Sequence, residues 1–321
     1  MSGSPFAEWA ASEYVVEESI KVVKELNCFD SDVNKIKLCM KKISIDELQS
    51  AYEKLGTTRP GLSPILYTPR IDDDFLPKTF EELIKEAPRK AILSGFASQE
   101  GAKLTVWPRQ LVRGQIIPRE EQFTYDGNRL FEFIKNYISP EEYFGSEATA
   151  KKVQTMVEEF YANDIPQNAD YKFWLQKYSQ LISDTSINMP QLEEAKLRAE
   201  HDWPVYFYQT AYFNYDAIKE TFKGDHPVKG AWHLSEYPYL FGFSSLDQFE
   251  FNENDWTIQK FWLELVENFV KNGNPSLPGL TWPRISKEKF QFVNVTIEPV
   301  VENDLMSDML TFWKELIENY R

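Results

Sequence analysis

Two short segments contain the residues that could act as a catalytic acid and a general base. Ser98-Gln99-Glu100-Gly101 directly follows an apolar run that ends at Ala97, and in open α/β sheets functional groups gather at the carboxyl ends of strands. His233 lies in the second segment, with Glu236 three residues further on. A carboxylate such as Glu100 can orient a histidine, which then acts as a general base. Each residue also has an ordinary interpretation: an exposed loop carboxylate for Glu100, a structural histidine for His233, and a helix-start carboxylate for Glu236.

Other catalytic and binding motifs do not occur in the sequence. No two glycines lie four apart, so there is no Gly-x-Ser-x-Gly nucleophile elbow. Gly56 and Gly61 have the spacing of a phosphate-binding loop but lack the lysine that must follow. Cys28 and Cys39 do not have zinc-ligand spacing, and residues 72–74, three aspartates, have the pattern of a solvated turn. We therefore expect no metal site and no cofactor.

Composition excludes several classes of protein. The 321 residues suffice for two domains or one large one. Lys plus Arg is 35 and Asp plus Glu is 50, a net charge of −15 that argues against nucleic acid as a partner. No apolar stretch approaches the length of a membrane span. Because the first residues do not resemble a signal peptide, we expect a cytoplasmic protein as the chain stands, and a secreted one if an upstream segment exists.

Helical patterns predominate, and a few apolar runs separate them. Strands are expected at residues 91–97 and 205–213, with a looser strand pair at 290–301. Helices are expected at residues 13–26, 44–55, 79–87, over much of 126–197, at 255–271 and at 304–321. Strands scattered among many helices predict an α/β layer fold.

Several short motifs then occur in an order typical of one enzyme family. They are Ser2-Gly3-Ser4-Pro5, Cys28 with Cys39, residues 69–77, Glu100-Gly101, residues 204–208, His233 with Glu236, residues 269–275 followed by Trp282-Pro283, and Phe312-Trp313. Each match is weak alone, but in this order they make the chain resemble the type-B carboxylesterase and cholinesterase family over its whole length.

The resemblance implies an α/β-hydrolase fold and ester hydrolysis by a Ser-His-Glu triad. Glu100 would be the triad acid and His233 the general base, so the two side chains must meet across the intervening sequence. Ser2 and Glu236 would be supporting residues near them. One departure is Gln99, which stands where the family usually has an acidic residue.

By the order of motifs in the family, the serine nucleophile and the glycine-rich oxyanion loop lie upstream of Ser2. The expected structure is therefore the C-terminal portion of an α/β hydrolase, helix-rich around a partial, mostly parallel sheet, in a single incomplete domain over residues 1–321. We expect a truncated or mis-split gene product that is inactive alone, and that takes a small-molecule ester only if an N-terminal half completes it. A strand edge and apolar helix surfaces should then be exposed.

Further expectations follow from the same resemblance. Cys28 and Cys39 would close the family's disulfide loop. Because family members often dimerise through a bundle that includes the last helix, residues 304–321 are expected to support a homodimer. Relatives of the neuroligin type use this fold for adhesion without a nucleophile, so a non-catalytic interaction module is an alternative function. One half of a split esterase is another.

Overall fold

The computed structural model describes residues 3–56, 65–106, 116–222, 224–242 and 249–320. Its strands are β1 (Ile92–Ala97), β2 (Val205–Thr210), β3 (Gln291–Val295) and β4 (Val300–Asn303). Its α-helices are α1 (Tyr14–Glu25), α2 (Val33–Met40), α3 (Ile45–Leu55), α4 (Phe80–Glu86), α5 (Ala102–Thr105), α6 (Arg119–Gln122), α7 (Gly127–Phe133), α8 (Glu141–Phe144), α9 (Glu147–Tyr161), α10 (Tyr171–Ser183), α11 (Met189–Glu200), α12 (Tyr215–Phe222), α13 (Tyr237–Phe241), α14 (Glu253–Asn272) and α15 (Ser307–Tyr320). Two π-helical turns, η1 (Ile134–Ile138) and η2 (Asp184–Asn188), extend α7 and α10.

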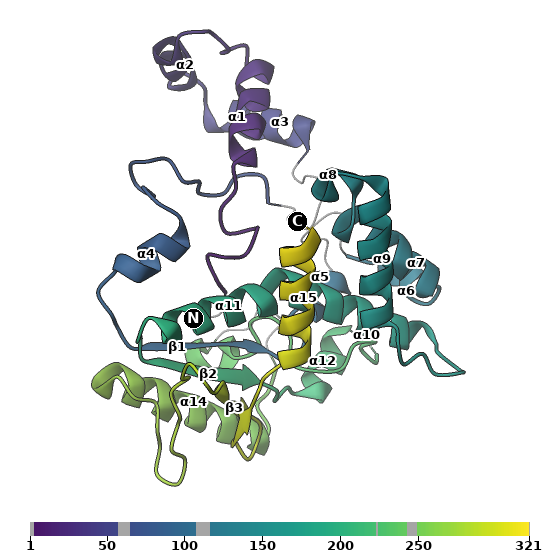
Figure 1. Ribbon diagram of the computed structural model, residues 1–321, viewed down its shortest axis with the longest axis vertical. Coiled ribbons are helices and arrows are strands. Elements are labelled where there is room, and N and C mark those ends of the chain that lie inside the picture. Colours follow the sequence, from purple (N-terminus) through teal and green to yellow (C-terminus); the bar gives the residue numbers. More distant parts are fainter. Residues whose placement is uncertain (1–2, 57–64, 107–115, 223, 243–248, 321) are drawn as a thin grey trace.

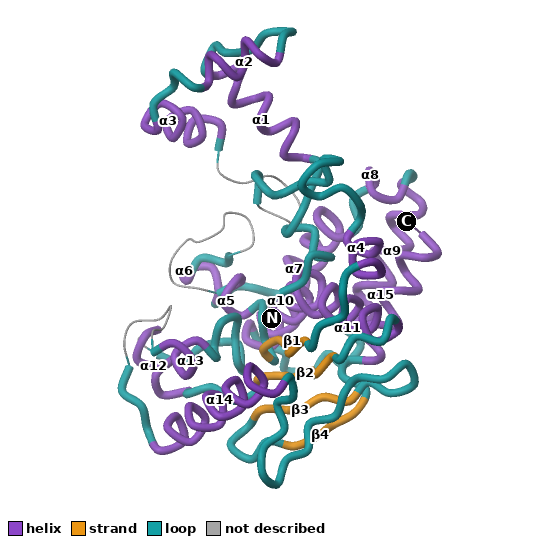
Figure 2. Tube along the Cα trace, turned by 90° about the vertical axis from the view of Figure 1, so that its left-hand side faces the viewer, coloured by secondary structure: helices purple, strands orange, loops and turns teal. Residues whose placement is uncertain are grey.

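One sheet runs through the body of the molecule, with strand order β1-β2-β3-β4 (Figure 2). β1 and β2 are parallel over their whole lengths, β2 and β3 are parallel, and β3 and β4 are antiparallel. The class expected from the sequence, helix-rich around a partial, mostly parallel sheet, is confirmed.

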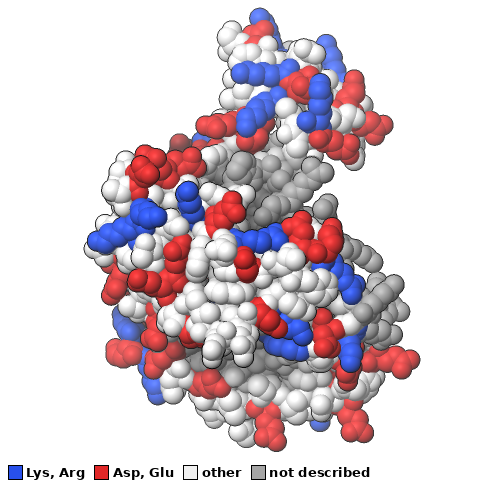
Figure 3. Space-filling view, turned by 90° about the vertical axis from the view of Figure 1, so that its right-hand side faces the viewer, with Lys and Arg blue, Asp and Glu red and all other residues white. Residues whose placement is uncertain are grey.

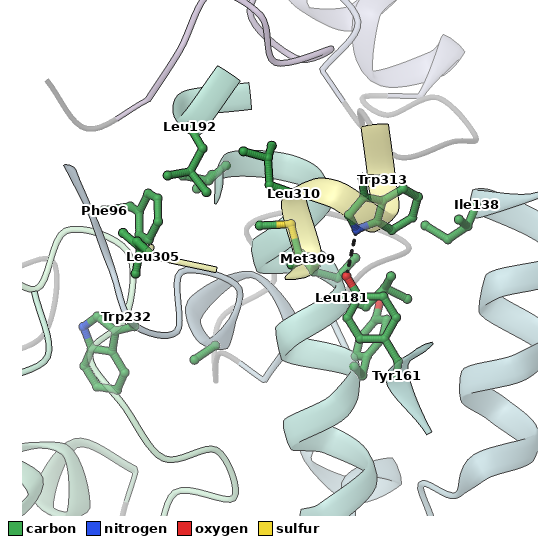
Figure 4. Close-up of a cluster of buried hydrophobic side chains, with 14 of the residues drawn as sticks. Phe96, Ile138, Tyr161, Leu181, Leu192, Trp232, Leu305, Met309, Leu310 and Trp313 are labelled. Atoms are coloured by element: carbon green, nitrogen blue, oxygen red, sulfur yellow. Dashed lines mark hydrogen bonds between the residues drawn. The ribbon is translucent and has the colours of Figure 1, made fainter. Parts of the chain in front are cut away.

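Helices cover both faces of this sheet (Figure 1). On β2, Tyr206 and Tyr208 belong to the core that α14 covers, and the Tyr208 ring lies 5.0 Å from the ring of Trp262. Phe207 points the other way, into the larger core that α11 and α15 help to form, 5.4 Å from the ring of Phe96. Figure 4 shows part of that core. Burial on both faces explains why β2 reads as one continuous apolar and aromatic run.

Two predicted boundaries differ from the structure for local reasons. β2 ends at Thr210 rather than residue 213, because the backbone N–H groups of Ala211 and Tyr212 both donate to the carbonyl of Val295. The helix α2, which the sequence did not predict, buries none of its side chains. Val33, Ile36 and Met40 do follow helical spacing, but the helix has only 8 residues, too few for the pattern to be decisive.

β1 forms an edge of the sheet within the described residues. Side chains form hydrogen bonds with some of the backbone groups that β2 does not pair. The Gly95 carbonyl accepts from Gln191 Nε2 at 2.7 Å, and the Ala97 N–H donates to Glu100 Oε1 at 2.6 Å. Gln191 Oε1 also accepts from the Gly3 N–H at 3.1 Å. The segment after Ser2 is therefore tied to β1 through one buried glutamine.

A lobe made of α1, α2 and α3 projects from the body (Figures 1 and 2). Its own core is small: Val22, Cys28 and Ala51 are its buried apolar residues. The expected pairing is present, with Cys28 and Cys39 joined in a disulfide whose Cα atoms lie 5.5 Å apart. The disulfide joins Cys39 of α2 to Cys28, three residues after the end of α1.

Reduction of this disulfide is expected to loosen α2. The bond joins residues 11 apart, and closing so short a loop contributes at most about 3 kcal/mol to the free energy of unfolding. Hydrogen exchange should therefore speed up in α2 after reduction or in a Cys39→Ser variant. The amides of α14, in the body, serve as the internal control, and equal protection of α2 in both redox states would contradict the prediction.

Two apolar grooves flank α1. One, of about 530 Å³, is lined by Val15, Ile20 and Phe75 among others. The second, of about 410 Å³, is lined by Val22, Ile45 and other side chains of α1 and α3. Phe75 is 86% exposed and Ile45 is 81% exposed. Contiguous exposed apolar surface of this kind indicates a binding site or a tendency to associate.

The lobe is therefore expected to bind the hydrophobic dye ANS and to promote self-association. A Phe75→Ser, Ile45→Ser double variant should lose most of the dye fluorescence, because it removes the most exposed apolar groups of both grooves. Val270→Ser is the matched control, since Val270 is 76% exposed on α14, away from the grooves. A monodisperse monomer in sedimentation that binds no dye would show that the prediction is wrong.

Basic and acidic side chains are interspersed on the face drawn in Figure 3. That pattern gives this face no continuous basic stripe of the kind that follows a phosphate backbone. No helix within the described residues is both long enough and apolar enough to span a bilayer.

Candidate functional site

Glu100 lies on the turn that follows β1, at the carboxyl end of the strand. Its side chain is fully buried, and both carboxylate oxygens are engaged. Oε1 accepts the Ala97 N–H at 2.6 Å, and Oε2 lies 2.6 Å from Nδ1 of His233. The interpretation of Glu100 as an exposed loop carboxylate is therefore wrong.

A close approach between two elements fixes the turn that carries Glu100. A Cβ on Gly101 would lie 2.3 Å from the backbone oxygen of Ser179 in α10, so only glycine fits there. The Gly101 N–H also donates to Ser183 Oγ at 2.8 Å. The glycine after Glu100 thus has a steric cause: it lets the backbone of α10 lie close to the turn that carries Glu100.

Backbone hydrogen bonds join the Glu100 turn to the segment before His233. The Gln99 N–H donates to the Ala231 carbonyl at 2.7 Å, and the Ala231 N–H donates to Ser98 Oγ at 3.0 Å. Gly230 has φ +127° and packs against Gln99, where a Cβ would lie 2.5 Å from Cγ. These contacts bring His233 to Glu100 across 133 residues of sequence, and the contact expected from the sequence is confirmed.

The geometry leaves His233 able to accept a proton. When Nδ1–H donates to Glu100, the lone pair of Nε2 is free, as a general base requires. The side chain is 25% exposed, so one side of the ring is open. Among the hydrogen bonds of the described residues, none involves Nε2 of His233.

Charges around His233 set its protonation. Burial by itself lowers the pKa of the imidazole, but the charge of Glu100, its hydrogen bond and the charge of Glu236 outweigh burial, and the pKa is raised above its ordinary value. Glu236 is 4% exposed, and burial together with the charge of Glu100 raises the pKa of its carboxyl. The charges of Glu100 and His233 both act on Glu236, and its supporting role stays a prediction.

The remaining predicted site residue is Ser2, which lies outside the described residues. Conversely, sequence reasoning missed Lys103, which lies three residues after Glu100 and is 6% exposed. Burial lowers the pKa of its ammonium group, and the charges of Glu100 and Glu236 oppose that effect. Helical spacing from Glu100 is the signal in the sequence that could have indicated it.

Comparison with known proteins agrees with this geometry. The sequence model of the Carboxylesterase family matches residues 1–313. The chain belongs to the carboxylesterase family. Gut esterase 1 of Caenorhabditis elegans is 30% identical over 328 residues, which cover 98% of this chain and 56% of that esterase.

More distant members of the carboxylesterase family are also similar along most of the chain. Acetylcholinesterase-1 of Trittame loki is 24% identical over 290 residues, 88% of this chain and 48% of the cholinesterase. Neuroligin-2 of Rattus norvegicus is 22% identical over 340 residues, 98% of this chain and 38% of the neuroligin. The chain spans about half the length of the esterases it matches.

The described part of the site shows no metal centre. Within the described residues, no three or more histidine, cysteine, aspartate or glutamate side chains are grouped so that they could hold a metal ion. The site consists of an imidazole that is hydrogen-bonded to a buried carboxylate, with further buried charged groups around it. The chain's membership of the carboxylesterase family is the basis for interpreting this pair.

Proposed function

We propose that this chain provides the acid and the base of a carboxylesterase catalytic triad. Glu100 holds the imidazole of His233 in the tautomer that carries the proton on Nδ1, and His233 uses Nε2 as the general base. The observation that carries this proposal is the 2.6 Å contact between Glu100 Oε2 and His233 Nδ1, made by a carboxylate whose other oxygen is already held by the backbone of β1.

In this proposal, ester hydrolysis depends on proton transfer through Nε2 of His233. Nε2 of His233 takes the proton of a serine hydroxyl as the serine oxygen attacks the ester carbonyl carbon, and returns it to the alkoxide that leaves. Water repeats the sequence on the acyl-enzyme. Glu100 stays ionised throughout and stabilises the imidazolium ion that forms in each step.

The serine and the oxyanion donors are the parts that the described residues do not supply. We infer from the family's order of motifs that they lie upstream of Ser2, in a segment corresponding to the part of gut esterase 1 outside its match with this chain. In this proposal the chain alone has no hydrolytic activity, and a small-molecule ester becomes a substrate only in the completed domain.

A chimera tests the proposal directly. The segment of gut esterase 1 that precedes its match to Ser2 is fused in front of this chain, and hydrolysis of a p-nitrophenyl ester is measured beside the chain alone. We expect turnover by the chimera and none by the chain. A chimera that folds, as judged by circular dichroism and a cooperative thermal transition, but does not turn over would contradict the assigned roles. Turnover by the chain alone that His233→Ala abolishes would place the nucleophile within residues 1–321.

A non-catalytic interaction module is the second candidate. The similarity to Neuroligin-2 along 98% of the chain and the exposed apolar grooves beside α1 favour it. A homodimer through residues 304–321 has less support, because α15 buries Met309, Leu310, Trp313 and Leu316 in its own core. The fully exposed residues of this helix are polar.

A further inference from the structure

Two further titratable side chains, Lys103 and Glu236, flank the contact between Glu100 and His233, and the four groups form one cluster. We call Glu100 and His233 the dyad. A second titratable residue follows each of them three residues later: Lys103 follows Glu100, and Glu236 follows His233. The exposed fractions of the flanking pair are 6% for Lys103 and 4% for Glu236, and Glu100 has none. A cluster this deeply buried must balance its charges internally, since water cannot.

The cluster contains one buried lysine facing two buried carboxylates. Glu100 and Glu236 repel each other, as the raised pKa of Glu236 reflects. The charge of Lys103 attracts both carboxylates and opposes protonation of His233. Lys103 lies in α5, which begins two residues after Glu100, so one short stretch of chain carries both residues.

Among the described residues, the other ionisable groups around the cluster are phenols. Tyr208 of β2 faces both carboxylates, and burial together with the charges of Glu236 and Glu100 raises the pKa of its hydroxyl, with Tyr237 of α13 close to it. The Tyr208 hydroxyl, with its raised pKa, carries no charge that could balance an anion. Lys103 is a buried cation whose charge interacts with Glu100, His233 and Glu236.

We propose that Lys103 is a positioning residue for the dyad: its ammonium group offsets part of the negative charge of Glu100 and Glu236 and thereby weakens the hold of His233 on a proton, so that more of the imidazole is ready to accept one. Lys103 need not touch the reacting atoms, because it acts through the charge of its neighbours. The catalytic consequence rests on the proposed function, whereas the charge balance is a property of the chain itself.

The proposal gives opposite results for the two flanking residues. Removing the lysine leaves two buried anions facing one imidazole, so His233 holds its proton more tightly and its pKa rises. Removing Glu236 takes away one of those anions, so the pKa of His233 falls. In a completed esterase, the first change would move the acid limb of the kcat/KM profile to higher pH, and the second would move it to lower pH.

Nuclear magnetic resonance of the full chain tests this without any activity. The sequence has three histidines, His201, His226 and His233, so selective histidine labelling gives three ring signals, assigned by His201→Gln and His233→Gln variants. The pKa of His233 is measured in the wild type and in Lys103→Met, Lys103→Arg and Glu236→Gln variants. Lys151→Met, the same substitution on the exposed face of α9, is the matched control.

We expect Lys103→Met to raise the pKa of His233, Glu236→Gln to lower it, and Lys103→Arg and Lys151→Met to leave it close to the wild-type value. If Lys103→Met does not fold, Lys103→Gln removes the same charge and keeps a polar side chain of similar reach. An unchanged or lowered pKa in a folded variant without the charge would overturn the proposal. That result would leave the triad assignment intact, because the esterase chimera tests the triad separately.

Discussion

Replacing His233 with alanine in the completed esterase is expected to lower kcat by about 10⁴-fold or more, the usual cost of losing the base of a serine triad. Without Nε2, nothing in the site takes the proton from the serine hydroxyl or returns it to the leaving alkoxide. The measurement is steady-state hydrolysis of a p-nitrophenyl ester by the chimera. His201→Ala is the control, since His201 ends α11 outside the dyad, and this variant should retain full activity.

Glu100→Gln tests the acid with almost no change in shape. Both oxygens of Glu100 accept hydrogen bonds, one from the Ala97 N–H and one from His233 Nδ1. An amide has one oxygen, so its NH₂ group must face either the backbone N–H or the imidazole. Facing the imidazole, it favours the tautomer with the proton on Nε2, which cannot act as a base. A loss of about 10⁴ in kcat is expected from the equivalent change in serine proteases, and wild-type kcat in a folded Glu100→Gln chimera would rule out this role.

The members of the dyad could be predicted from the sequence, but their burial and contacts could not. Glu100 and His233 were identified because each sits in a short motif, and the motifs occur in the order of a known family. Taken alone, Glu100 was indistinguishable from a loop carboxylate. What buries it is the approach of α10 to Gly101 and the pairing of Gln99 with Ala231, contacts between segments far apart in the chain.

Elements with a long pattern of apolar residues were predictable, including α1 and α3, which bury one residue each. The aromatic run of β2 and the stripe on α14 both follow from burial against the sheet. α2 escaped prediction because it has only 8 residues, although Val33, Ile36 and Met40 follow helical spacing. Lys103 escaped because a lysine in a short turn normally indicates solvent, and only the packing of the neighbouring segments encloses it.

The same limit applies to a buried polar network that no motif indicated. Asp184, at the start of η2, accepts hydrogen bonds from Gln180 and Asn188 on one oxygen and from Tyr161 on the other. The Tyr161 oxygen in turn accepts from Trp313 Nε1 of α15 at 3.0 Å, the dashed line in Figure 4. Burial raises the pKa of Asp184 to about 6 despite these three donors.

His226 has the opposite shift. It is 1% exposed between the rings of Phe222 and Trp232, and burial lowers the pKa of its imidazole to about 4. The ordinary pKa values are 3.8 for aspartate and 6.5 for histidine. The two groups therefore change the free energy of unfolding over the same range of pH, but in opposite directions.

The sign of each effect follows from which state binds the proton. Between pH 4 and 6 the folded protein holds a proton on Asp184 that the unfolded chain has released, so the free energy of unfolding falls as pH rises, by about 3 kcal/mol in all. As the pH falls from 6.5 to 4, His226 takes up a proton in the unfolded chain but stays unprotonated in the folded protein. The free energy of unfolding therefore falls as pH falls, again by about 3 kcal/mol.

Asp184→Asn is accordingly expected to expose a pH dependence that the wild type conceals. The amide oxygen still accepts from Gln180 and Asn188, but the proton that opposed the effect of His226 is gone. In urea unfolding between pH 4 and 6.5, the stability of this variant should rise with pH by about 3 kcal/mol more than that of the wild type. His226→Gln should show the reverse trend, and Asp308→Asn, on the exposed face of α15, should follow the wild type. If the profile of Asp184→Asn runs parallel to that of the wild type, Asp184 titrates at its ordinary pKa, and the buried network does not hold its proton.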